Sequence, residues 1–199
     1  MSEVKIERKV IRLAILGDST VGKTSIINAY FNVEFSQVMM QSVGKDKYDT
    51  QLKMKDGKEM KLVIWDTAGQ ERFHSISLST IKSSQGVVVA FDITNKPTFD
   101  NVIHWLKDIR DNSNDIPIVL FGNKSDLAEK RKVTTKEAEE FSKKNKIIYF
   151  ETSAKENKNI EEGINEIAEL AYKKSSGQYG MELKKDKKNK KNKKNIKFC

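Results

Sequence analysis

A short segment near the amino terminus, GDSTVGKT, has residue types and a spacing that suit the binding of a polyphosphate. Four residues separate Gly17 from Gly22, and Lys23 and Thr24 follow directly. In such a loop, backbone N–H groups point inward at phosphate oxygens, the lysine reaches the outer phosphates and the hydroxyl binds Mg²⁺. An accidental glycine-rich turn is the plainer alternative. The apolar run before the loop and the amphipathic run after it favour a phosphate loop, because that motif joins a strand to a helix.

Three later segments carry polar residues directly after apolar runs. They are WDTAGQERF at residues 65–73, FGNKSD at 121–126 and ETSAK at 151–155. Each falls at the carboxyl end of an expected strand, where open α/β sheets bind ligands. A phosphate loop alone does not distinguish adenine from guanine nucleotides, because both carry the same polyphosphate. These segments therefore decide which base is bound.

Together with the phosphate loop, the three segments resemble the motifs of the Ras superfamily of small GTPases, and most closely those of its Rab branch. The resemblance covers about residues 8–174 in motif order and spacing. It implies an α/β fold, the P-loop GTPase or G domain, with a mostly parallel six-stranded sheet, one antiparallel edge strand and helices on both faces. It also implies a switch in membrane traffic that alternates between GTP and GDP, with Mg²⁺ as cofactor.

The resemblance assigns the recognition of guanine to Asp126, which would accept hydrogen bonds from N1 and the exocyclic amine. Adenine lacks this donor pair and would leave the carboxylate unpaired. Asn123 and Lys124 would brace the base, Ala154 would offer its N–H to the guanine oxygen, and Lys155 would pack over the ring. The nucleotide-binding residues implied are Gly17, Asp18, Ser19, Thr20, Val21, Gly22, Lys23, Thr24, Ser25, Phe35, Ser42, Gly69, Asn123, Lys124, Asp126, Ser153, Ala154 and Lys155.

The resemblance also implies the machinery of hydrolysis. Gln70 would orient the attacking water, and Thr24, Ser42 and Asp66 would hold Mg²⁺. Ser42 and the N–H of Gly69 would lose their partner when the γ-phosphate leaves, so both switch segments would relax. No arginine in these loops is an obvious catalytic finger. Unaided hydrolysis should therefore be slow, which implies a GTPase-activating protein.

The first switch departs from the Rab pattern T-I-G-V-D-F, because this chain has SVGKDKY. Ser42 keeps the hydroxyl of the usual threonine but lacks its methyl group. Counting back from the DG turn places Tyr48 rather than Lys47 at the phenylalanine position, which indicates one inserted residue, accommodated as a bulge. The aromatic pair that usually follows the second switch is missing. The aromatic patch that faces effectors is therefore expected to comprise Trp65 and Tyr48.

Apolar runs alternate with amphipathic stretches along the chain, as in parallel sheets covered by helices. Residues 46–54 instead alternate in polarity, which is typical of an edge strand, and the KDGK segment then forms a hairpin turn. The expected strands are residues 10–16, 46–54, 60–65, 86–91, 116–121 and 146–150, and the expected helices are 21–31, 97–111, 134–145 and 159–174.

Helix starts are indicated by Thr134, which forms a capping box with Glu137, and by Asn159. The two histidines, His74 and His104, lack metal-ligand spacing, and they are expected, like Trp105, to be packing or surface residues.

Most of the net charge of +9 lies near the carboxyl terminus, where residues 184–199 hold nine lysines and one acid. We expect residues 1–174 to form the G domain and residues 175–199 a disordered polybasic tail. A specific nucleic-acid partner is not expected, because such proteins carry their positive patch on the folded domain. The amino terminus lacks an apolar signal region, and no run approaches 18 apolar residues, so a cytoplasmic monomer is expected.

Cys199 is the only cysteine and the last residue of the sequence. By the resemblance it is a prenylation site, although neither the C-a-a-X motif nor a double cysteine is present. Modification would then need an escort protein that reads the folded domain. One lipid chain plus the lysines would give reversible attachment to the cytosolic face of endomembranes or the plasma membrane. The implied partners are an exchange factor, a GTPase-activating protein, effectors and a GDI or escort protein.

Other functions remain as alternatives. A GTP-binding scaffold with little hydrolysis is favoured by the altered first switch and opposed by Gln70. Another signalling GTPase of the Ras superfamily shares the same motifs. A nucleic-acid-associated GTPase is favoured only by the lysine tail, and an ATP-dependent kinase is disfavoured by Asp126.

Overall fold

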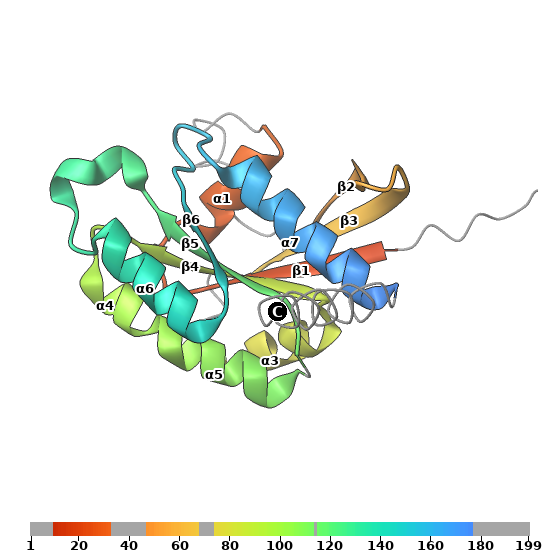
Figure 1. Ribbon diagram of the computed structural model, residues 1–199, viewed down its shortest axis with the longest axis horizontal. Coiled ribbons are helices and arrows are strands. Elements are labelled where there is room, and N and C mark those ends of the chain that lie inside the picture. Colours follow the sequence, from red (N-terminus) through yellow and green to blue (C-terminus); the bar gives the residue numbers. More distant parts are fainter. Residues whose placement is uncertain (1–9, 33–46, 68–73, 114, 177–199) are drawn as a thin grey trace, which may run out of the picture.

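The computed structural model of the chain describes residues 10–32, 47–67, 74–113 and 115–176, and for residues 74–78 the backbone alone. Six strands form one sheet in the order β2-β3-β1-β4-β5-β6 (Figure 1). Neighbouring strands are parallel except β2 and β3, which are antiparallel. The strands are β1 (Val10–Leu16), β2 (Lys47–Lys53), β3 (Glu59–Asp66), β4 (Gly86–Asp92), β5 (Ile118–Asn123) and β6 (Ile148–Glu151). The predicted sheet, mostly parallel with one antiparallel edge strand, is confirmed.

Helices connect the strands. They are α1 (Lys23–Tyr30), α3 (His74–Ser83), α4 (Lys96–Asp100), α5 (Val102–Asn112), the 3₁₀ helix η1 (Ser125–Lys130), α6 (Thr135–Asn145) and α7 (Ile160–Ser175). The single helix expected over residues 97–111 is in fact α4 and α5, with Asn101 between them. The sequence analysis did not predict α3 or η1.

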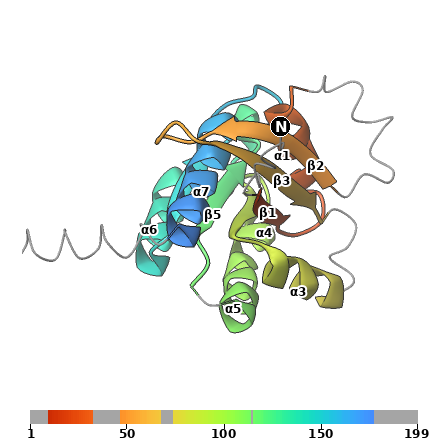
Figure 2. The ribbon, with the colours of Figure 1, turned by 90° about the vertical axis from the view of Figure 1, so that its right-hand side faces the viewer.

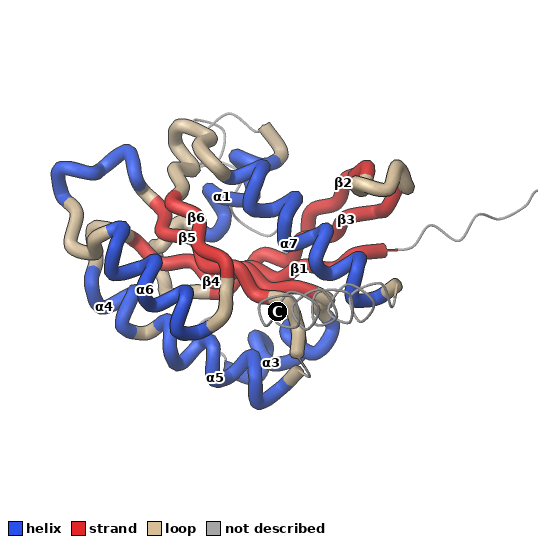
Figure 3. The backbone as a smooth tube through the Cα atoms, in the orientation of Figure 1, coloured by secondary structure: helices blue, strands red, loops and turns tan. Residues whose placement is uncertain are grey.

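The helices form a layer on each face of the sheet (Figure 3). Helices α1 and α7 cover one face, where Leu13 and Ile15 of β1 pack with Ile26 and Ile164. Helices α3 to α6 cover the other face, and there Leu16 of β1 belongs to a second apolar cluster. Successive residues of a strand point to opposite faces, so a nearly continuous apolar run supplies both clusters.

The edge strand β2 pairs with β3 in a register that corrects two expectations (Figure 2). The ladder runs without a break from Lys47 to Lys53, so the described part of this strand contains no bulge. Tyr48 lies opposite Ile64, and its ring centroid is 5.6 Å from that of Phe31 on the side of α1. Lys47 lies opposite Trp65, with Nζ 5.7 Å from the centre of its ring. The expected patch of Trp65 with Tyr48 is therefore wrong, because the two side chains lie on opposite faces.

The helix starts agree only in part with the sequence analysis. The hydroxyl of Thr134 accepts a hydrogen bond of 3.2 Å from the N–H of Glu137, as a capping residue does. Asn159 has φ of 57°, and its side-chain amide instead donates to the carbonyl of Glu151 at 2.8 Å. The predicted start of α7 at Asn159 is confirmed, but the side chain of Asn159 makes no capping hydrogen bond. The side chain ties the start of α7 to the end of β6.

Candidate functional site

The phosphate loop predicted from the sequence connects the carboxyl end of β1 to α1. Gly17 and Gly22 have φ of +142° and +98°. A Cβ atom at Gly17 would overlap the carbonyl oxygen of Ala90, and one at Gly22 would lie 2.5 Å from Nδ2 of Asn123. Only glycine fits at either position, since the loop lies directly against the ends of β4 and β5.

Lys23 opens α1 and is 4% exposed. Its ammonium donates hydrogen bonds to the carbonyl oxygens of Gly17, at 3.0 Å, and Asp18, at 2.9 Å, so the charge lies inside the curve of the loop. A buried cation beside a helix amino terminus is a favourable environment for a polyphosphate.

Two oxygen groups suited to a metal come together beside this loop. The hydroxyl of Thr24 donates to Oδ2 of Asp66 at 2.6 Å, although the two residues come from different elements. Asp66 ends β3 and is 7% exposed. Magnesium prefers few carboxylates together with water and phosphate oxygens, and this pair fits that preference. Among the described residues, no group of three or more histidine, cysteine or acidic side chains could hold a metal.

Asn123, at the end of β5, links the phosphate loop to the segment after β6. It is 1% exposed, and its amide nitrogen donates to the carbonyl of Val21 at 2.8 Å. Its amide oxygen accepts a hydrogen bond of 3.2 Å from the N–H of Ala154. One side chain therefore fixes the distance between the predicted phosphate-binding and base-binding segments.

Asp126 of η1 is fixed by the neighbouring loop. Oδ1 of Asp126 accepts a 2.7 Å hydrogen bond from the hydroxyl of Ser153, which is fully buried. That hydroxyl in turn accepts from the N–H of Glu156 at 3.1 Å, and the backbone of Ser125 donates to Thr152 at 3.0 Å. The carboxylate predicted to read the base is thus held in a defined orientation.

Asp92, which ends β4, was not among the site residues predicted from the sequence. Its Oδ2 is 2.6 Å from the ammonium of Lys124, and its Oδ1 accepts hydrogen bonds from the N–H and the hydroxyl of Thr94. Lys124 itself has φ of +70°. A signal was available, because Asp92 follows an apolar strand next to β5 at the ligand-binding edge of the sheet. Lys155, by contrast, is exposed.

Trp105 makes a contact that the sequence did not predict. Its indole N–H donates to Oδ1 of Asp18 at 2.9 Å, and the side-chain amide of Asn101 donates to Oδ2 of the same carboxylate at 2.7 Å. The expected packing role is confirmed, because Trp105 packs against the apolar cluster that contains Leu106, but its hydrogen bond to the phosphate loop was not predicted. No feature of the sequence alone pairs residues this far apart.

A second charged cluster joins Glu151, at the end of β6, to the segment that follows η1. Both guanidinium nitrogens of Arg131 bind the carboxylate of Glu151, at 2.8 and 2.9 Å, and the hydroxyl of Thr135 donates to it at 2.8 Å. Burial raises the pKa of Glu151, but these hydrogen bonds outweigh burial, so the net pKa lies below its ordinary value. Burial, with Glu151 nearby, also raises the pKa of Tyr149.

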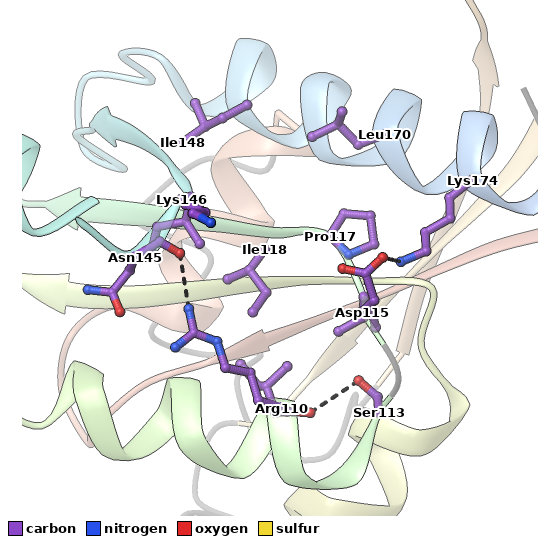
Figure 4. A pocket seen from close by; sticks show the side chains of 13 residues that line it. Arg110, Ser113, Asp115, Pro117, Ile118, Asn145, Lys146, Ile148, Leu170 and Lys174 are labelled. Atoms are coloured by element: carbon purple, nitrogen blue, oxygen red, sulfur yellow. Dashed lines mark hydrogen bonds and ion pairs between the residues drawn. The ribbon is translucent and has the colours of Figure 1, made fainter. Parts of the chain in front are cut away.

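A cavity of about 390 Å³ lies at the other end of the sheet, near the start of β5 (Figure 4). Pro117 and Leu170 line it, the ammonium of Lys174 is 2.8 Å from Asp115, and Arg110 donates to the carbonyl of Asn145 at 3.0 Å. It contains none of the residues predicted to bind nucleotide.

In the described ranges no helix has both the length and the apolar character of a membrane span.

The remaining predicted residues divide into two groups. Ser19 and Thr20 are exposed in the loop, and Ser25 is half-buried on α1. The predicted residues that lie outside the described ranges are Phe35, Ser42, Gly69, Gln70 and Cys199.

Comparisons with known proteins place the sequence of this chain in one family. Residues 12–173 match the family described as Ras family. The chain is 35% identical over 170 residues to the Ras-related protein Rab-13 of Mesocricetus auratus, covering 85% of this chain and 83% of the relative. It is 38% identical over 161 residues to the Ras-related protein Rab-10 of Diplobatis ommata, covering 80% of each chain. Rab-13 of Rattus norvegicus is also 35% identical over 170 residues, again covering 85% of this chain and 83% of the relative.

Proposed function

The chain belongs to the Ras family as a Rab-like small GTPase of membrane trafficking, and from this premise we propose which of its residues do the work. The loop from Gly17 to Thr24 binds the phosphates of GTP and GDP, and Asp126 selects guanine. The observation that carries this proposal is the pair of hydrogen bonds of Asn123, to Val21 and to Ala154. They hold the phosphate loop and the base loops as one unit.

Magnesium is bound by Thr24 and Asp66, together with Ser42 and phosphate oxygens. The fit rests on the 2.6 Å contact between the hydroxyl and the carboxylate. When bound, the ion neutralises charge on the β- and γ-phosphates. Lys23 would bind the same phosphates, and Asp66 would help Thr24 to hold the ion. Gln70 orients the water that attacks the γ-phosphate, while Ser42 and Gly69 sense whether that phosphate is present.

Nucleotide selectivity tests the assignment of Asp126. We expect the purified wild-type protein to hold GDP or GTP, identified by mass, and to release little adenine nucleotide. Xanthine carries a carbonyl oxygen where guanine has its exocyclic amine, so an amide at this position complements xanthine instead. The substitution Asp126→Asn should weaken GDP binding by more than tenfold and improve XDP binding. Unchanged GDP affinity in this variant would contradict the assignment.

Hydrolysis tests the assignment of Gln70. In a single turnover with bound GTP, we expect a wild-type rate on the order of 10⁻⁴ to 10⁻³ per second, since no arginine in the predicted loops is an obvious finger. The substitution Gln70→Leu should slow the reaction about tenfold or more while leaving GTP affinity within twofold of wild type. Equal rates for the two proteins would remove Gln70 from the mechanism and favour a scaffold with little hydrolysis.

Regulators and membrane attachment belong to the same proposal. Slow hydrolysis implies a GTPase-activating protein, and nucleotide-binding loops that hydrogen bonds hold together imply an exchange factor that opens them. Effectors bind selectively to the GTP-bound form. The lysines of residues 184–197 and a lipid on Cys199 attach the protein reversibly to the cytosolic face of a membrane, with a GDI or escort protein as the soluble carrier.

A further inference from the structure

The phosphate loop contains an acidic side chain, Asp18, whose two carboxylate oxygens are bound by Trp105 of α5 and by Asn101, the residue directly before α5. Oδ2 accepts from the amide of Asn101 at 2.7 Å, and Oδ1 accepts from the indole of Trp105 at 2.9 Å. The three residues bring together segments more than eighty positions apart. Each distance is that of a well-formed hydrogen bond to a charged acceptor.

The position of this carboxylate matters because the loop binds an anion. Two negative charges a few ångströms apart repel, and the repulsion grows where water is excluded. Asn101 and Trp105 are both neutral, so they leave the charge of Asp18 in place. What they supply is a fixed location for that charge, against α5.

Helix α5 is a firm support for such a contact. Val102, Leu106 and Ile109 of this helix are fully buried, in the same apolar cluster as Val89 of β4 and Ile81 of α3. Trp105 therefore projects from a helix that is packed on the sheet, and Asn101 directly precedes that helix. A side chain on a packed helix loses little further freedom when it forms a bond.

The loop, in contrast, needs external support. Gly17 and Gly22 have positive φ angles, and so does Thr20, at 66°, a conformation that costs a non-glycine residue energy. Asn123 holds the loop at Val21 from β5. Asp18 is the point at which α5 holds it from the other side.

We propose that Asn101 and Trp105 are positioning residues for the nucleotide. They hold Asp18, and through it the phosphate loop, in the conformation that retains the phosphates. Losing either donor speeds nucleotide release and leaves the choice of base unchanged. This inference rests on the proposed nucleotide site.

The test measures release of a fluorescent GDP analogue from the full-length protein, in Mg²⁺ and excess unlabelled GDP. Trp105→Phe keeps an aromatic ring but removes the N–H, and we expect release about tenfold faster than in wild type. Asn101→Ala should give a similar change. Asn101 is exposed and caps no helix with its side chain, so this variant tests the proposal even if Trp105→Phe fails to fold. Lys107→Ala, at an exposed position of α5, should release at the wild-type rate.

A double-mutant cycle separates positioning through Asp18 from simple loss of packing. In an Asp18→Ala background, Trp105→Phe should change the release rate less than twofold, because the acceptor of its hydrogen bond is gone. A tenfold acceleration that persists in that background would overturn the inference, as would wild-type release rates for both single variants. Discrimination between GDP and ADP should stay at the wild-type value throughout, and a loss of it would also count against the inference. A wild-type protein that binds no guanine nucleotide would instead overturn the proposed function.

Discussion

Single side chains join loops that are distant in the sequence. Asn123 bonds to Val21 and Ala154, and Ser153 fixes Asp126, so several residues that could touch a nucleotide also hold each other. The sequence motifs predicted the residues of these contacts. They did not predict the contacts with neighbouring helices and strands, such as that of Lys124 with Asp92, because those partners lie outside the motifs.

Glycine at position 22 provides a test at this scale. A methyl group there would lie 2.5 Å from the amide nitrogen of Asn123, whereas at Gly57, also at positive φ, nothing lies within 4 Å. Both Gly22→Ala and Gly57→Ala should cost about 1 kcal/mol from backbone strain. Only Gly22→Ala should also weaken GDP binding, by tenfold or more, as measured by titration calorimetry. Equal losses of affinity in the two variants would show that the contact with Asn123 is unimportant.

At the scale of elements, the helices that the sequence failed to predict depend on tertiary contacts. Helix α3, HSISLSTIKS, is rich in serine and threonine, which are weak helix formers in isolation. Its Ile81 is 1% exposed and packs in one cluster with Val102 and Leu106 of α5. The free energy gained by burying such a side chain outweighs the low helix propensity of the segment. The strands and α1, α6 and α7 were predictable to within about two residues, because their apolar periodicity is local.

The ion pair of Arg131 and Glu151 joins β6 to the segment after η1, and it predicts a pH dependence. The folded-state pKa of Glu151 is lowered, so its ionised form stabilises the fold above the unfolded-state pKa, about 4.3, and this stability is lost as pH falls through the folded-state pKa. Glu151→Gln should lower the free energy of unfolding by about 1–2 kcal/mol at pH 7. Denaturant titrations should show the difference from wild type shrinking as the pH falls below about 4.

The matched control is Glu139→Gln. Glu139 is half-exposed and lies 3.8 Å from Lys143, so its loss should change stability by less than about 0.5 kcal/mol at either pH. If Glu151→Gln lowered the free energy of unfolding by the same amount at every pH, the loss would arise from packing rather than from charge.

For the whole molecule, the sequence predicted the layered architecture and the position of the site at one edge of the sheet. It did not predict the face on which Tyr48 lies, because the strand register is a property of the pairing with β3 rather than of either strand alone. The assignments to Ser42, Gly69, Gln70 and Cys199 stay predictions, since these residues lie outside the described ranges.

Membrane attachment is the prediction that belongs to the molecule as a whole. In cell fractionation, Cys199→Ser should move the protein from the membrane to the soluble fraction, because lysines alone bind weakly to a surface. Wild-type protein should also detach partly as the salt concentration is raised. Each lysine near an anionic leaflet contributes about 1 kcal/mol of electrostatic binding free energy, and salt weakens this attraction by screening. A Cys199→Ser protein that stays with the membrane would exclude the lipid anchor.

The two outer strands of the sheet have a consequence for how this protein behaves when crowded. Strand β2 alternates exposed and half-buried residues, with Lys47, Asp49 and Lys53 among the exposed ones, and β6 at the opposite edge is only four residues long. Charged side chains and brevity both discourage a foreign strand from extending a sheet. Both edges of the sheet therefore disfavour the edge-to-edge stacking that leads to aggregates, even where copies of the chain are locally concentrated.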